Sequence, residues 1–186
     1  MPNVFENRIV RPVRIVTENI TFDGLLNISL GARTLDELNL TSRPFLVLSN
    51  SVLQTGTWDV DDGPVVINKS FIVFVLAIPD LGAPLGGAAE EPEMRRIGRA
   101  ALRLRTRDHA IEGFVHSGPG SSSLARLNQA THPFVALQSA AVKGPGAEFS
   151  TPFLAVNRAH IVSAQEMFNV SAVPEEVAAA SGDTSS

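Results

Sequence analysis

Two stretches of eleven residues, LNLTSRPFLVL at 38–48 and LNQATHPFVAL at 127–137, are nearly the same and lie 89 positions apart. With this offset and no gap, residues 14–73 and 103–162 share 13 identities over 60 positions. Ordinary composition would give about four. Two copies at this spacing do not form a solenoid, which stacks shorter repeats and needs at least three. The chain is therefore expected to hold two homologous small domains in tandem.

The offset also sets the expected domain boundaries. The first barrel repeat is expected over residues 1–78 and the second over 98–170. The segment between them, 79–97, is rich in Pro, Gly and Ala, which is typical of a linker. Residues 171–186 are mostly small or polar, and this composition predicts a disordered tail.

Each copy has the pattern of short strands. Apolar and polar residues alternate over 13–29, with breaks expected at Glu18-Asn19 and Asp23-Gly24. Residues 44–53 form another candidate strand. The long segment 64–78 is expected to turn at Asn68-Lys69 from one strand into the next, because Asn tolerates turn conformations. The predicted fold is all-β and mainly antiparallel, with two tandem small β-barrel-like domains packed as a pseudo-dimer.

One short helical turn is predicted in each copy, over Thr34–Asn39 and over the matching segment that begins at Ser123. Thr34 and Ser123 are the expected caps, and Glu37 is placed to complete a capping box in the first copy.

The predicted helical turn also explains why the eleven residues are repeated. Asn39 and Asn128 are expected to end it, since Asn suits a helix C-terminus. The matched pairs that come next are expected to enter and fill the core, namely Pro44/Pro133, Phe45/Phe134 and Leu48/Leu137.

Composition narrows the function classes. The net charge of −4 and the pI of about 5.5 disfavour a dedicated nucleic-acid binder. The absence of Cys excludes disulfides, thiolate metal sites and Cys nucleophiles. The first residues lack the pattern of a signal peptide, and the longest apolar run, 71–79, is too short for a membrane span, so a soluble cytoplasmic protein is expected.

The segments VVINKSFIVFV and LAVNRAHIVSA resemble the last hairpin of Sm-like domains, with an apolar residue, a basic turn and an Ile-containing strand. Each copy as a whole resembles small SH3-like or Sm-like barrels and bacterial domains of unknown function with the layout DG…L.ELN…PFL.L. The Sm-like resemblance implies RNA or nucleotide contacts by an early-loop residue and a basic turn residue, here Asn27 with Lys69 and His116 with Arg158. The turn glycine of that family is replaced by Ser70 and Ala159.

An arginine-rich segment offers a second route to an anionic partner. On one strand, Arg103, Arg105 and Arg107 would share a face and form a basic stripe. The alternative is a solvated face whose charges pair with Glu90, Glu91 and Glu93.

Other polar patterns lack the spacing that chemistry needs. The four His residues form no metal-binding motif, GPGSSS lacks the Lys of a phosphate-binding loop, and WDVDDGP lacks the last ligand of a calcium loop. No catalytic residue, metal or cofactor is therefore predicted.

A non-catalytic binding or assembly protein is the leading hypothesis, and nucleic-acid or nucleotide binding through the arginine stripe is the alternative. The strand FIVFVLAI of the first copy is expected to be covered on both faces, by the other copy or by a partner. In the second copy, Ser163 and Gln165 replace its Phe74 and Leu76. The candidate surface for a protein partner or for self-association is Phe71, Phe74, Leu76 and Trp58.

Overall fold

The computed structural model describes residues 8–55, 63–78, 98–117, 122–145 and 147–167. The predicted linker at 79–97, the predicted tail at 171–186, Trp58 and the three Glu residues at 90, 91 and 93 lie outside the described residues.

The first half of the chain forms five strands and two short helices. They are β1 (Arg8–Thr17), β2 (Thr21–Ser29), α1 (Thr34–Asn39), β3 (Phe45–Thr55), β4 (Val65–Asn68), the 3-10 helix η1 (Lys69–Phe71) and β5 (Ile72–Ala77). The expected break near Glu18 and the expected helical turn over Thr34–Asn39 are both confirmed.

The second half follows the same order of elements. They are β6 (Gly98–Arg105), β7 (Ala110–Ser117), α2 (Ser123–Gln129), β8 (Phe134–Gly144), β9 (Ala147–Asn157), the 3-10 helix η3 (Arg158–His160) and β10 (Ser163–Met167).

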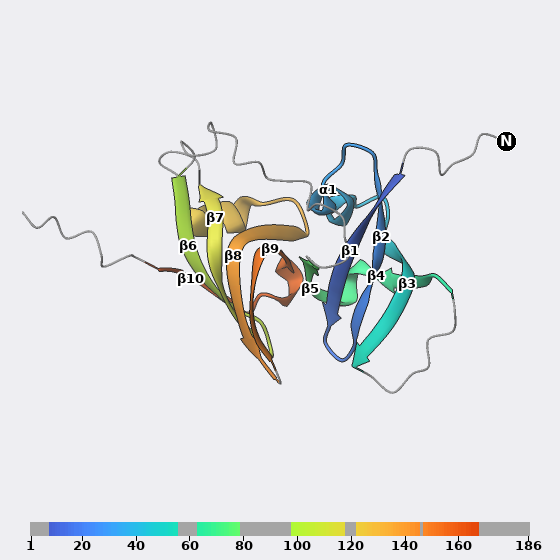
Figure 1. Cartoon of the computed structure of the whole chain (residues 1–186). Helices are drawn as coiled ribbons and strands as arrows, with labels where there is room; N and C mark the ends of the chain where they lie inside the picture. Colours follow the sequence, from blue (N-terminus) through green and yellow to red (C-terminus); the bar gives the residue numbers. More distant parts are fainter. Residues whose placement is uncertain (1–7, 56–62, 79–97, 118–121, 146, 168–186) are drawn as a thin grey trace, which may run out of the picture.

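All ten strands belong to one antiparallel sheet, in the order β10-β6-β7-β8-β9-β5-β1-β2-β3-β4. This confirms the all-β, mainly antiparallel class. The five strands of each half have the same neighbours, with the last strand beside the first and the fourth strand at the far side. Figure 1 shows the halves side by side, with β5 and β9 at the centre.

The expected hairpin over 64–78 is wrong, although the turn itself is present. Asn68 caps η1 by accepting a hydrogen bond from the Ser70 N–H at 2.9 Å. However, β4 pairs with β3 and β5 pairs with β1, so the two strands lie at opposite sides of their half. The 3-10 helix carries the chain across instead of folding one strand back on the other.

Gly24 and Gly113 allow a close approach in each half. A Cβ on Gly24 would lie 3.2 Å from the Ser49 carbonyl oxygen, and one on Gly113 would lie 3.2 Å from the Leu137 Cβ. The pairing of β2 with β3, and of β7 with β8, shifts register at these glycines. The break expected at Asp23-Gly24 is thus a bulge inside a continuous strand.

Both helix caps lie one residue before the expected ones. Arg33 is the N-cap of α1, and its N–H donates to the Asp36 carboxylate at 2.9 Å. Ser122 is the N-cap of α2, and its hydroxyl accepts from the Ala125 N–H at 3.5 Å. The Glu166 carboxylate of β10 also accepts from the Ser123 N–H at 2.5 Å, which ties α2 to the last strand.

Two apolar clusters form the core, and each takes side chains from both halves. The cluster built on the first half includes Phe134 and Ala155 from the second half. The cluster built on the second half includes Phe74 and Leu76 from the first half. The halves are therefore joined by shared cores as well as by paired strands.

Candidate assembly surface

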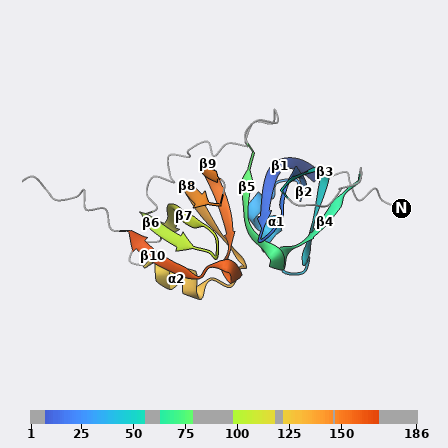
Figure 2. The same ribbon diagram turned by 90° about the horizontal axis from the view of Figure 1, so that it is seen from below.

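We call the contact between the two halves the joint. At its centre, β5 of the first half pairs with β9 of the second. β5 and β9 run antiparallel, with Phe74 opposite Val156, Val75 opposite Ala155 and Leu76 opposite Leu154. Five of the six residues of β5 are buried, which confirms that this strand is covered on both faces. Seen from below, β5 and β9 stand next to each other between the two halves (Figure 2).

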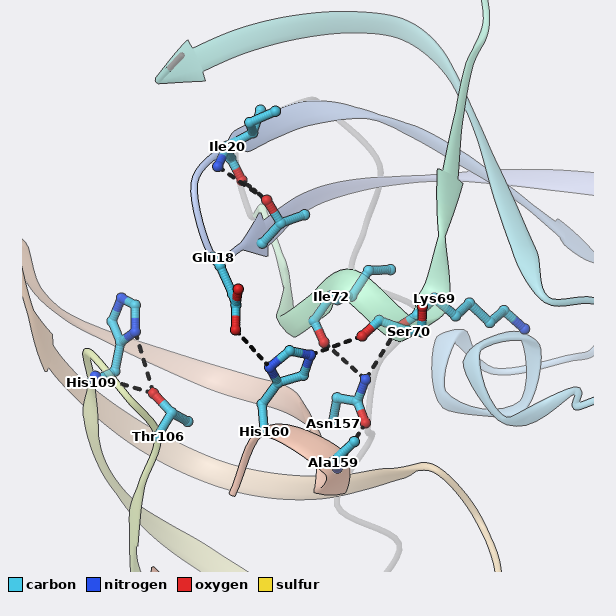
Figure 3. A network of polar contacts seen from close by, with 11 residues as sticks. Glu18, Ile20, Lys69, Ser70, Ile72, Thr106, His109, Asn157, Ala159 and His160 are labelled. Atoms are coloured by element: carbon cyan, nitrogen blue, oxygen red, sulfur yellow. Dashed lines mark hydrogen bonds and ion pairs between the residues drawn. The ribbon is translucent and has the colours of Figure 1, made fainter. Parts of the chain in front are cut away.

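Asn157 at the end of β9 is the central polar residue of the joint. The residue is 3% exposed, and its amide donates to the carbonyls of Lys69 at 3.1 Å and Ile72 at 2.9 Å. Its own oxygen accepts from the Ala159 N–H at 3.0 Å. In Figure 3 this amide points from the second half at the backbone of η1. It adds a donor from the second half to two buried carbonyls of the first half, of which the Lys69 carbonyl also accepts from the Ile72 N–H.

Asn39 fixes the other side of the joint. Its amide donates to the Phe134 carbonyl at 3.2 Å, and its oxygen accepts from the Phe134 N–H at 2.9 Å. The expectation that Asn39 ends its helix as a cap is wrong, because Leu40 is the C-cap. Asn39 instead replaces the missing strand neighbour at the start of β8.

Two histidines complete the polar side of the joint. His160 lies between the Glu18 carboxylate, 3.7 Å away, and the Ser70 carbonyl, 2.9 Å away (Figure 3). His109 packs edge-to-face on Phe74 with ring centroids 5.0 Å apart. Burial lowers the pKa of His109 from its ordinary value, while nearby Asp108 raises it less. The hollow between these side chains has room for about one water molecule, which is too small for a substrate.

The outer end of the sheet exposes apolar side chains. We call Phe45, Val47, Val66 and Phe71 the β4 edge, and they are 50%, 43%, 60% and 63% exposed. Val47 pairs with Val66 across the two strands, and Phe45 lies two residues before Val47, so three of them share a face.

The residues 89 positions later than this edge are covered. Phe134 is 2% exposed and Ala155 is 0% exposed. The His160 side chain, which stands where Phe71 does, is 16% exposed. The expectation that Phe45 fills the core like Phe134 is therefore wrong. Phe134 is buried by the first half of the chain, and no described element covers Phe45 in the same way.

The other predicted contact residues are placed differently. Phe74 and Leu76 are 1% and 8% exposed and pack in the core of the second half. They serve the joint inside one molecule, whereas Phe71 faces outward. Trp58 is outside the described residues.

The arginine stripe is shorter than expected. β6 ends at Arg105, so Arg107 lies in the turn that follows and does not continue the strand face. Arg103 is paired with Glu112 at 2.7 Å, as Arg14 is with Asp23. Arg105 and Arg107 are exposed.

The two basic turn residues are helix caps in this structure. The Lys69 ammonium donates to the carbonyls of Glu37 at 2.7 Å and Leu40 at 2.9 Å, at the C-terminus of α1, and burial lowers its pKa. Arg158 donates to the Ala130 carbonyl and to the His132 carbonyl at 3.2 Å, beyond α2. Cations at a helix C-terminus satisfy its free carbonyls.

Of the two early-loop residues implied by the Sm-like resemblance, Asn27 bonds elsewhere through its side chain and His116 through its backbone. The Asn27 amide donates to the Ser49 hydroxyl at 3.0 Å on β3. The His116 carbonyl accepts from Arg126 at 2.5 Å. No hydrogen bond or ion pair joins Asn27 to Lys69, or His116 to Arg158, within the described residues.

Within the described residues, no group of three or more His, Asp or Glu side chains is placed to hold a metal ion. No helix in that part of the chain is long and apolar enough to cross a membrane.

The roles of Asn39 and Asn157 at the joint escaped the sequence analysis. The signal was present, because Asn39/Asn128 and Asn68/Asn157 are identical pairs in the repeat. Local turn chemistry, which Asn also favours, explains the same identities, so the pattern alone does not reveal contacts across the joint.

Comparisons with models of protein families, with curated proteins and with solved structures find no match to this chain.

Proposed function

We propose that this chain is a non-catalytic assembly protein built from two copies of a small β-barrel-like domain that pack as a pseudo-dimer. The matching strand order of the two halves and the 13 identities at the 89-residue offset support the duplication. We further propose that the β4 edge is its protein-binding surface.

The observation that carries the proposal is the difference between matched residues. Phe45 and Val66 are at least half exposed, while Phe134 and Ala155 are buried by an adjoining strand and helix. The same surface is thus already used once, inside the molecule, to bind a protein element. Within the described residues, β4 pairs only with β3, and an exposed apolar row beside such a free strand edge favours a protein partner.

The test compares Val66→Lys with Val10→Lys. Val10 is 48% exposed on β1, away from the β4 edge, and serves as the matched control. A tagged chain is co-expressed with an untagged copy and purified, and the proteins retained in stoichiometric amount are weighed by native mass spectrometry.

The proposal predicts a stoichiometric partner, either the untagged copy or another protein, that Val66→Lys loses and Val10→Lys keeps. Retention of the same partner by Val66→Lys would contradict it, as would the absence of any partner from all three chains.

A further inference from the structure

Resting on the proposed function, we infer that the occupant of the β4 edge is the β10 side of a second copy of this chain. The contact would repeat the joint between the two halves, so that molecules associate head to tail.

The first argument is the strand order. Within the described residues, β4 and β10 each have a single paired neighbour and end the sheet on opposite sides. β4 corresponds to β9 and β10 corresponds to β5 in the order of each half. The two unpaired edges are therefore the counterparts of the two strands that pair at the joint.

The second argument is burial on the β10 side. We call Leu127, Ile161, Val162 and Ala164 the β10 face; the first, second and fourth are partly buried, and Val162 is 74% exposed. Their counterparts in the first half are Leu38, Ile72, Val73 and Val75, which are 0%, 0%, 4% and 0% exposed.

The side chains that would cover the β10 face are the ones that are exposed on the β4 edge, at the other end of the sheet. Leu38, Ile72 and Val75 pack in the cluster that Phe134 and Ala155 complete. On the β10 face, the corresponding covering residues would be Phe45 and Val66, which the β4 edge presents. The β4 edge and the β10 face are thus complementary. Two β4 edges would not complement each other in this way.

The strand register and the asparagine contacts of the joint can be applied to the proposed contact, with each residue replaced by its counterpart 89 positions away. The joint register predicts that Val65, Val66 and Ile67 of one molecule lie opposite Gln165, Ala164 and Ser163 of the next. Asn128, which is exposed, would bond the backbone of Phe45 as Asn39 bonds that of Phe134.

Asn68 and Phe71 fit the same placement. The Asn68 amide would donate to the carbonyls of Arg158 and Ile161, as Asn157 donates to those of Lys69 and Ile72. Phe71 would take the position of His160 and meet Arg107, the counterpart of Glu18, where a cation and an aromatic ring attract.

The contact is weaker than the joint in one respect. Phe74 and Leu76 enter the neighbouring core at the joint, and their counterparts on β10 are Ser163 and Gln165, which are exposed. The proposed contact therefore keeps the apolar packing on one face of the paired strands and has polar residues on the other. The association is therefore reversible and depends on concentration. A head-to-tail contact gives a closed ring or a growing filament, according to the rotation between copies.

The experiment uses two variants that disable one surface each. Val66→Lys blocks the β4 edge and Val162→Asp blocks the β10 face, and both residues are mostly exposed, so the fold is kept. Val10→Lys is the control, and circular dichroism checks folding. Light scattering behind a sizing column gives the mass of each variant and of an equimolar mixture of the two.

We expect wild type and Val10→Lys to form multimers, and each single variant to have the monomer mass of 19.8 kDa. The mixture should give a species of twice that mass and nothing larger, because one intact edge and one intact face remain for a single contact.

Two results would overturn the inference. If Val162→Asp associates like wild type while Val66→Lys does not, two β4 edges bind each other, and the proposed function survives without the head-to-tail contact. If wild type is a monomer at every concentration, self-association is wrong, and only a foreign protein lost on Val66→Lys would keep the proposed function.

Discussion

The two copies of the eleven-residue motif, at 38–48 and 127–137, are nearly the same in sequence but lie in different surroundings. Phe134 at the start of β8 is buried by the first half and held by Asn39, whereas Phe45 at the start of β3 is half exposed. The difference shows that the motif is an interface element as well as a core element. Its burial depends on whether a neighbour is present, and inside one chain only one of the two copies has that neighbour.

The largest effect is expected from replacing the two matched phenylalanines. Phe134→Ala should lower the free energy of unfolding by about 3–5 kcal/mol, because it leaves a cavity in a closed core. Phe45→Ala should lower it by less than about 1 kcal/mol in the monomer, since this residue is already half exposed to water. Urea unfolding at low protein concentration measures both, and equal losses would contradict the assignment of Phe45 to a surface.

The two asparagines at the ends of β4 and β9 give the next effect. Asn157→Ala should lower the free energy of unfolding by about 2–3 kcal/mol, because two hydrogen bonds to buried carbonyls are lost. Asn68→Ala should cost about 1 kcal/mol, since only its cap to Ser70 is lost. Thermal unfolding of dilute samples compares them. A larger loss of stability for Asn68→Ala than for Asn157→Ala would contradict the role of Asn157 as the central polar residue of the joint.

Giving β10 the apolar residues of β5 should strengthen the proposed self-association. The double variant Ser163→Phe/Gln165→Leu restores the side chains that enter the neighbouring core at the joint. The dissociation constant for self-association should fall about tenfold or more, which corresponds to ~1.4 kcal/mol of added apolar contact. Sedimentation velocity over a dilution series provides the constant. An unchanged constant would mean that β10 does not enter the contact.

The smallest effect is a pH dependence at the joint. The pKa of His109 is lower in the folded protein than the ordinary value of 6.5, because burial disfavours the charged ring. The unfolded chain therefore binds the proton more readily. The stabilising contribution of neutral His109 is complete above about pH 6.5 and is lost as pH falls toward the folded pKa.

Unfolding of wild type and of His109→Gln between pH 5 and about pH 8 tests this. The wild-type midpoint should fall more on acidification than that of the variant. The opposite order would show that the ring is charged in the fold.

The strands and the short helices were predictable from the sequence because their signals are local. Alternation over 13–29 and the Thr34–Asn39 turn depend on neighbouring residues, and the structure confirms both. The hairpin over 64–78 failed because Asn68-Lys69 specifies a turn but not which strand pairs with which. That choice depends on contacts with β1 and β3, which are distant in sequence.

The candidate site was less predictable for a related reason. Phe71, Phe74 and Leu76 all looked like possible contact residues, because each is a large apolar residue in one strand segment. Only the fold separates Phe71, which is exposed, from the other two, which the second half buries. In the same way, the identity of Asn39 with Asn128 marked a shared requirement, but a side chain reaching residue 134 leaves no local pattern.

Because the chain has no Cys, single Cys variants can test the proposed head-to-tail contact between β4 and β10. Val66→Cys and Ala164→Cys are made as separate single variants, and oxidation is followed by non-reducing gels. Residues directly opposite on antiparallel strands are close enough for a disulfide. The head-to-tail register predicts covalent dimers from the mixture of the two variants, and few from either one alone. Replacing Ala164→Cys by Gln165→Cys, which points to the other face, should abolish them. Dimers formed equally well by Val66→Cys alone, or none from the mixture, would contradict the account.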